Sequence, residues 1–332
     1  MIFHPAIIAL LLSSVLMSFL AIYSSFFAIL IHRKWDLRNG SELQLVLERR
    51  TYLISTILTY IFAFQILSFF LYIFTADRLH TLFVGAMCAA GTLQVNEFGY
   101  PALLLKIFNC LLAGIWLILN HTDNRAFDYP LIRKKYVFLL LMAPLLLMEM
   151  YLQGAYFLSL QPNIITSCCG SLFSVGETAL ASELTALPPK PTMLAFYLST
   201  GASLAAGVYF LLKKRGAYLF AVLSTIMFLV SIASILSFIS VYFYELPTHH
   251  CPFCILQQEY GYIGYPLYAS LFGSGIAGMG AGILAPIRKR ESLAAIIPPL
   301  QKKLVWVSII LSLFFAAIVT YRLVFTDFIL LG

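Results

Sequence analysis

The run AYLFAVLSTIMFLVSIASILSFISVYF, residues 217–243, contains no Asp, Glu, Lys or Arg. A helix needs about 20 apolar residues to cross the hydrocarbon core of a bilayer, and this run is longer than that. Seven further segments have the same character, at residues 5–32, 51–75, 100–120, 137–160, 193–212, 262–286 and 304–325. The sequence therefore predicts eight transmembrane helices and leaves no separate soluble domain.

The overall composition points to the same class of protein. The chain has 332 residues, of which 61% are hydrophobic and 11% are charged, and its mean hydropathy is +0.92. A soluble domain usually has roughly 25% charged residues. We therefore expect an all-α polytopic integral membrane protein whose main surroundings are membrane lipid. Gly278 and Gly282, four residues apart, predict close helix packing in the seventh segment.

The basic residues predict the orientation of the chain in the membrane. Of the 21 Lys and Arg residues, all but four lie in or beside the first, third, fifth and seventh connections. Lys135 is counted with this majority. The exceptions are Arg78, Lys106, Lys190 and Arg322. Because Lys and Arg concentrate on the cytoplasmic side of membranes, we expect both termini outside. The net charge of +7 then follows from topology, and no nucleic-acid partner is expected.

The predicted orientation gives most of the six cysteines a common location. Cys110 lies within a predicted helix, where a thiol usually acts as a small apolar group. The other five are predicted to face outward: Cys88, Cys168, Cys169, Cys251 and Cys254. If the membrane is a bacterial inner (cytoplasmic) membrane, its periplasmic face is oxidising. Cysteines clustered there are expected to form disulfides, redox couples or metal sites.

Two similar phrases suggest an internal repeat. They read MCAAGTLQVNEFGYP at 87–101 and THHCPFCILQQEYGYIGYP at 248–266, and each follows the second apolar segment of a group of four. When Cys88 is aligned with Cys251, a Leu-Gln pair in each phrase also aligns. After a one-residue gap, a Glu-aromatic-Gly-Tyr run in each phrase aligns as well. Gly91 of the first phrase stands opposite Cys254 of the second. The alternative is that Gly and aromatic residues recur at membrane interfaces. Parallel repeats often enclose a site between them.

The repeat defines a predicted division of the chain. We expect a first four-helix membrane half at 1–160 and a second at 193–332. Between them, residues 161–192 form a predicted outer loop that carries Cys168 and Cys169.

The Cys-x-x-Cys pair of Cys251 and Cys254 stands just before the seventh apolar segment. The positive end of a helix dipole favours a thiolate and hence reversible disulfide exchange. Pro252 fixes one backbone angle between the two cysteines. The spacing therefore predicts a redox-active couple at the start of a membrane helix.

The stretch CPFCILQ, Cys251 to Gln257, resembles the Cys-x-x-Cys motif of the DsbB family and, more distantly, that of vitamin K epoxide reductase relatives. The resemblance implies a membrane thiol:disulfide oxidoreductase that exchanges electrons between an outer-face thiol protein and a membrane quinone. In such a mechanism Cys251, as the more exposed member, would attack a mixed disulfide, and Cys254 would face the quinone. Cys168 and Cys169 would exchange with the soluble partner.

The chain also departs from those families. They are built on four helices, and DsbB proteins commonly have an arginine where Gln258 and Glu259 follow this motif. A disulfide between the adjacent Cys168 and Cys169 would be strained. Either of these two cysteines could pair elsewhere instead, for instance with Cys88, and the sequence leaves the connectivity open.

Polar residues inside the apolar segments give a predicted quinone site. Charged groups within a bilayer are costly and often mark function. Hydrogen-bond donors at similar depth would suit a quinone headgroup, and the candidates are Gln65, Lys106, Asn109, Glu149 and Gln153. The alternatives are a structural ion pair of Lys106 with Glu149, or a Lys106 side chain that extends to the membrane surface.

Two other functions are compatible with the cysteines. His249, His250, Cys251 and Cys254 supply two imidazoles and two thiols within six residues, a ligand set suited to zinc or copper in a metal-handling protein. Alternatively, the chain is a non-catalytic subunit of a respiratory or cofactor-assembly complex, and disulfides hold its outer loops. No nucleotide-binding or hydrolase motif is present in the sequence.

Overall fold

The computed structural model describes all residues except 1–2, 36–41, 162–163, 167–186, 327 and 329–332. Helix accounts for 81% of it, and the described residues contain no strand. Eight helical segments are long and apolar enough to cross a membrane, which confirms the predicted number. They are Pro5–Lys34, Gln44–Leu82, Gly99–Asp123, Ile132–Leu158, Pro189–Lys213, Ala217–Tyr244, Gly264–Ile287 and Ile297–Phe325.

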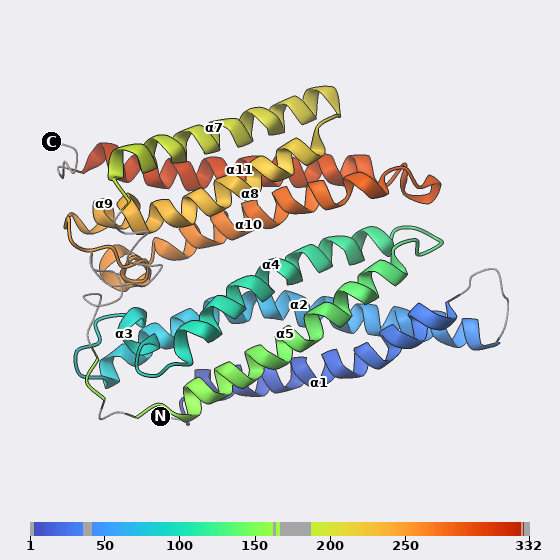
Figure 1. Cartoon of the computed structure of the whole chain (residues 1–332), viewed down its shortest axis with the longest axis horizontal. Coiled ribbons are helices and arrows are strands. Elements are labelled where there is room, and N and C mark those ends of the chain that lie inside the picture. The colour runs from blue at the N-terminus through green and yellow to red at the C-terminus, as the bar shows by residue number, and fades with distance from the viewer. Residues whose placement is uncertain (1–2, 36–41, 162–163, 167–186, 327, 329–332) are drawn as a thin grey trace. The chain divides into compact units, whose positions relative to one another are not determined.

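The helices follow one another in the order shown in Figure 1. The long ones are α1 (Pro5–Lys34), α2 (Glu42–Arg78), α4 (Gly99–Asp123), α5 (Ile132–Leu158), α7 (Pro189–Lys213), α8 (Ala217–Ser234), α10 (Gly264–Ile283) and α11 (Ile297–Phe325). The short ones are η1 (Leu79–Leu82), α3 (Ala89–Leu93), η2 (Ile235–Ile239), α9 (Ser240–Tyr244), η3 (Cys254–Leu256), η4 (Gln258–Tyr260), η5 (Ala285–Ile287) and η6 (Glu291–Leu293). Of the short helices, η1, η2, α9 and η5 continue the long helix before them, whereas α3, η3, η4 and η6 lie in connecting segments.

The chain divides into two compact units. The first contains residues 1–75, 93–161 and 288–297, and the second contains 76–92, 162–287 and 298–332. Residues 76–92, which include Cys88, therefore belong to the second unit although the predicted first half contained them. Whether the units arose by duplication, and on which side of a membrane the termini lie, stay predictions.

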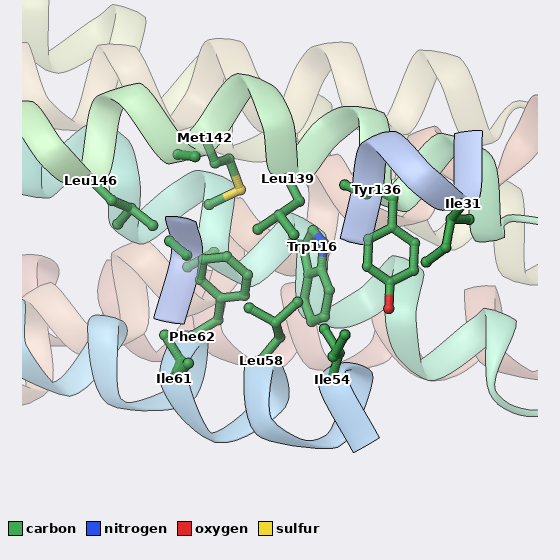
Figure 2. Packing of buried hydrophobic residues seen from close by; sticks show 14 of the residues in the cluster. Ile31, Ile54, Leu58, Ile61, Phe62, Trp116, Tyr136, Leu139, Met142 and Leu146 are labelled. Atoms are coloured by element: carbon green, nitrogen blue, oxygen red, sulfur yellow. The ribbon is translucent and has the colours of Figure 1, made fainter. Parts of the chain in front are cut away.

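In the first unit α1 and α4 both pack on α5, and an aromatic core lies among the four long helices (Figure 2). Trp116 is fully buried there, with its ring centroid 4.8 Å from that of Phe62. Its indole Nε1–H donates to the carbonyl of Lys135 at 3.2 Å. A buried Trp needs such a partner for its N–H, so this hydrogen bond fixes the ring between α4 and α5.

Lys135 differs from the expectation for its side chain. The sequence predicts Lys135 to be among the charges of a cytoplasmic connection, but it lies in the first turn of α5 with no exposed surface. Its Nζ is 2.7 Å from Asp123 Oδ2 and 3.0 Å from Asn120 Oδ1. The buried carboxylate compensates the lysine charge, which is the condition under which a charge can be buried.

In the second unit α7 and α10 both pack on α8, and small residues set the spacing. A Cβ atom added to Gly278 would lie 2.5 Å from the Cβ of Ser224, and one added to Gly282 would lie 2.3 Å from that of Ala221. Ser224 and Ala221 belong to α8. The predicted role of these glycines in close helix packing is confirmed.

The two helices that follow the repeated phrases begin alike. The triplet Gly-Tyr-Pro opens α4 at Gly99 and opens α10 at Gly264. A Cβ at Gly99 would meet the carbonyl oxygen of Leu93 at 2.2 Å, and one at Gly264 would meet that of Ile255 at 2.9 Å. In both places glycine lets the helix start against the backbone of a short preceding helical turn.

The close contact at Gly278 gives a stability prediction. We expect Gly278→Ala to lower the free energy of unfolding by about 1–3 kcal/mol, because the new methyl group overpacks against α8. Gly201→Ala in α7 is the matched control, since a Cβ there meets no atom within 4 Å. Thermal unfolding of the purified variants in detergent measures the difference. Equal midpoints for the two variants would contradict the close packing.

Candidate functional site

The second unit brings three cysteines together. The sulfur atoms of Cys88, Cys251 and Cys254 all lie within 4.8 Å of one another, and the Cys88 and Cys251 sulfurs are 3.5 Å apart. A disulfide bond is about 2.05 Å long, so this pair is in contact and not bonded to each other. We call the three residues the cysteine trio. The fold thus adds a third sulfur to the Cys-x-x-Cys pair from a residue 163 positions away.

Two tyrosines hold the Cys-x-x-Cys turn in place. The hydroxyl of Tyr244 donates to the carbonyl of Cys251 at 2.5 Å and accepts from the backbone N–H of Ile255 at 2.9 Å. From α10, the hydroxyl of Tyr268 donates to the carbonyl of Pro252 at 2.6 Å. Buried backbone groups need such partners, so the two side chains fix a turn that has little regular secondary structure of its own.

The segment that carries Cys88 is tied to the same turn. The amide Nε2 of Gln257 donates to the carbonyl of Met87 at 2.7 Å and to Asp77 Oδ1 at 3.2 Å. The same Asp77 oxygen accepts the backbone N–H of Ala89 at 3.3 Å. These hydrogen bonds flank Cys88 on both sides in the sequence and position its sulfur against Cys251.

The two histidines have different surroundings. His249 places Nε2 3.4 Å from the sulfur of Cys254, and its ring stands edge-on to Tyr244 with the centroids 4.4 Å apart. Burial lowers the pKa of His249 because it disfavours the charged imidazolium, although the nearby Cys88 acts in the opposite direction. His250 donates Nδ1–H to the carbonyl of Leu236 at 2.9 Å. Leu236 lies in η2, a π-helical segment, and such segments are frequent at functional sites.

The structure changes two expectations about the Cys-x-x-Cys pair. Cys251 is fully buried and Cys254 is 6% exposed, so Cys251 is not the more exposed member. The cysteines also do not sit at the start of a membrane helix, because α10 begins only at Gly264 and Cys254 opens the short η3 instead. A helix dipole acts within about one turn. The α10 dipole therefore does not explain any special reactivity of these thiols.

Of the remaining cysteines, only Cys110 lies within the described residues. Cys168 and Cys169 lie outside the described residues. Cys110 is buried in α4 of the first unit. Gly91, which stands opposite Cys254 in the predicted repeat, lies where an added Cβ would be 2.9 Å from the Cα of Ala86. A cysteine side chain does not fit at position 91 without a backbone shift.

The predicted quinone-binding residues form a closed polar cluster in the first unit. Lys106 Nζ makes an ion pair with Glu149 Oε1 at 2.7 Å, and both side chains are buried. Gln65 and Asn109 donate to the other oxygen, Oε2, at 2.5 and 2.6 Å. Gln153 is separate and donates to the carbonyl of Leu10 at 2.8 Å. The ion pair that we considered as an alternative is present, and quinone binding by these residues stays a prediction.

A groove of about 680 Å³ lies in the second unit beside the Cys-x-x-Cys segment. Its volume is in the range of small-molecule sites. The ring of Tyr260, which lines it, packs edge-on to Tyr244 with the centroids 5.0 Å apart. The lining consists of Phe243, Glu259, Tyr260, Gly261, Ile263, Phe314, Ala317, Ile318, Tyr321 and Arg322.

Sequence reasoning did not find the residues that support the trio. Tyr244 and Tyr268 read as ordinary aromatic residues of apolar segments, and no pattern shows that their hydroxyls reach the cysteine turn. Gln257 carried a weak signal, because the repeat alignment matched it with Gln94. Arg322, which lines the groove, carried another, as one of the three basic residues predicted on the outer side, with Arg78 and Lys190.

Comparison with protein-family models, with curated proteins and with solved structures found no match to this chain.

Removal of the Tyr244 hydroxyl should loosen the cysteine turn. In Tyr244→Phe the Cys251 carbonyl and the Ile255 N–H lose their partner, at a cost of about 1–3 kcal/mol for a buried polar group. After mild reduction, we expect maleimide to label Cys251 and Cys254 about tenfold faster or more, since local opening becomes easier. Tyr218→Phe, on the exposed face of α8, is the control. Unchanged labelling in Tyr244→Phe would show that this hydroxyl does not hold the turn.

The Lys106 ion pair gives a second prediction. Lys106→Met leaves the Glu149 carboxylate buried and uncompensated, which we expect to lower the free energy of unfolding by about 3–5 kcal/mol. The double variant Lys106→Met/Glu149→Gln should recover most of this loss, because the neutral amide oxygen still accepts from Gln65 and Asn109. Unfolding in detergent tests both variants. If the double variant is as unstable as the single one, the pair is not held by charge compensation.

Proposed function

We propose that the protein is a membrane thiol:disulfide oxidoreductase that exchanges electrons between an outer-face thiol protein and a membrane quinone. The observation that carries the proposal is the cysteine trio, in which three sulfurs lie within 4.8 Å of one another. Thiol–disulfide exchange needs an attacking thiolate next to a disulfide sulfur. Three adjacent sulfurs allow a disulfide to move from one pair to another within the protein.

The contact of Cys88 with Cys251 specifies the internal step. With a disulfide between Cys251 and Cys254, the Cys88 thiolate attacks the Cys251 sulfur from a starting distance of 3.5 Å. The Cys88–Cys251 bond forms, the Cys251–Cys254 bond breaks, and Cys254 leaves as a thiolate. His249, 3.4 Å from the Cys254 sulfur, is placed to exchange a proton with it. Because Cys88 and Cys251 are fully buried, exchange with the soluble partner begins at Cys254 or at the predicted outer-loop pair Cys168 and Cys169.

The groove beside Tyr260 is our proposed site for the quinone. Its apolar walls include Phe314 and Ile318, and Glu259, Tyr260 and Arg322 offer hydrogen bonds to a headgroup. Tyr260 contacts Tyr244, Tyr244 contacts His249, and His249 contacts Cys254. In the complete reaction a dithiol gives two electrons and two protons to the quinone, and the products are a disulfide and a quinol.

The positions of the basic residues support an outer location for the trio. In the second unit Lys213, Lys214 and Arg215 precede α8, whereas the trio lies beyond the other end of the α8–η2–α9 segment. Because basic residues favour the cytoplasmic side, we place the trio on the periplasmic face of a bacterial inner membrane with both termini outside. The shared Gly-Tyr-Pro starts of α4 and α10 support two repeated halves.

Electron exchange with a quinone tests this function. Detergent-purified, metal-free protein is mixed with dithiothreitol and a short-chain ubiquinone, and quinol formation is followed by absorbance. The reverse reaction uses the quinol and oxidised glutathione. We expect turnover above background in at least one direction by wild-type protein and by Cys110→Ala, a variant that removes a cysteine outside the trio. Cys251→Ser and Cys254→Ser should reduce turnover to background because each removes a sulfur of the exchanging pair.

Two results would overturn the proposal. The first is turnover in Cys254→Ser equal to that of Cys110→Ala. The second is a wild-type protein that transfers no electrons in either direction while its trio holds a disulfide that only a strong reductant breaks. The second result would favour structural disulfides in a non-catalytic subunit.

A further inference from the structure

We infer that the cysteine trio, when reduced, forms a binding site for one thiophilic metal ion of the zinc type, with His249 as the fourth ligand. This site differs from the metal set suggested by sequence, because it includes Cys88 and omits His250. It does not depend on the oxidoreductase function. It rests on the distances among three sulfur atoms and on the distance from His249 Nε2 to one of them, all in the second unit.

The sulfur separations are close to those of tetrahedral coordination, and His249 reaches one of the three sulfurs. With zinc–sulfur bonds of about 2.3 Å and a zinc–nitrogen bond of about 2.0 Å, neighbouring sulfurs lie about 3.8 Å apart and a sulfur and a nitrogen about 3.5 Å apart. The Cys88 and Cys251 sulfurs are 3.5 Å apart, and His249 Nε2 is 3.4 Å from the Cys254 sulfur. All three sulfurs lie within 4.8 Å of one another, so each sulfur pair is within about 1 Å of the required separation.

The choice of His249 over His250 follows from their hydrogen bonds. His250 donates Nδ1–H to the carbonyl of Leu236, so this nitrogen is committed to η2. His249 directs Nε2 to Cys254, and the contact with Tyr244 limits its ring orientation. With its proton on Nδ1, His249 offers a lone pair on Nε2, the nitrogen in contact with Cys254.

The surroundings hold the ligands in place before metal binds. Tyr244 and Tyr268 fix the backbone at Cys251 and at Pro252. Gln257 and Asp77 fix the segment around Cys88. Hydrogen bonds that orient metal ligands raise affinity, and their loss typically costs about 10- to 100-fold. The site is also buried, with at most 6% of any of the three cysteines exposed, as expected for a closed structural site.

Metal content of the reduced full-length protein tests the inference. The protein is reduced in detergent without oxygen, incubated with Zn²⁺, and freed of unbound metal by gel filtration before elemental analysis. We expect one zinc per chain in wild-type protein, in Cys110→Ala and in His250→Ala. Cys88→Ser and Cys254→Ser should lose it. Co²⁺ in place of Zn²⁺ should give the sulfur-to-cobalt absorption and the visible bands of a tetrahedral site, and the visible bands should change in His249→Ala.

A measurement on unaltered protein covers the case in which variants fail to fold. Zn²⁺ should slow alkylation of Cys88, Cys251 and Cys254, mapped by mass spectrometry, and leave alkylation of Cys110 unchanged. Absence of bound metal and of protection in reduced wild-type protein would overturn the inference. The inference would also be overturned if the Cys88→Ser variant keeps its zinc while the His250→Ala variant loses it. Because quinone turnover is measured on metal-free protein, failure of the metal site and failure of the oxidoreductase function give different results.

Discussion

Within a bilayer, each backbone N–H and C=O group must find its partner inside the protein, and this requirement controls the rest of the structure. Helices meet it segment by segment, and the long apolar segments of this chain are helical. Side chains that carry polar groups into these segments face the same requirement. Glu149 accepts from Lys106, Gln65 and Asn109. The result is a stable polar cluster inside an otherwise apolar unit.

The Cys-x-x-Cys pair of the cysteine trio lies in a segment where side chains, and not a regular helix, supply many of the backbone hydrogen bonds. Residues 245–263, between α9 and α10, form only short helical turns, and side chains supply many of their backbone partners. Tyr244 serves both Cys251 and Ile255, and Gln257 serves Met87. The irregular backbone lets sulfur atoms from two distant segments converge, which two straight neighbouring helices would not do. The same convergence supports both proposals, disulfide exchange and metal binding, since each needs sulfurs a few ångströms apart.

Close packing places limits on how each unit can vary. Gly278 and Gly282 bring α8 and α10 together, and Gly91 sits where a larger side chain would meet Ala86. A cysteine at position 91, which stands opposite Cys254 in the predicted repeat, has no room without a backbone shift. The third sulfur of the trio comes from Cys88, the predicted counterpart of Cys251.

The helical fold and the number of apolar spans can be predicted from the amino-acid sequence, because hydrophobic length is a local property that a single segment displays. The sequence also identified the Cys-x-x-Cys pair, and it allowed the Lys106–Glu149 pair as an alternative. The contact of Cys88 with Cys251, the contact of His249 with Cys254 and the burial of Lys135 against Asp123 emerge only in the folded chain. These contacts depend on how separate segments pack. Cys88 and Cys251 are 163 residues apart in the sequence, and no local pattern encodes the distance between them.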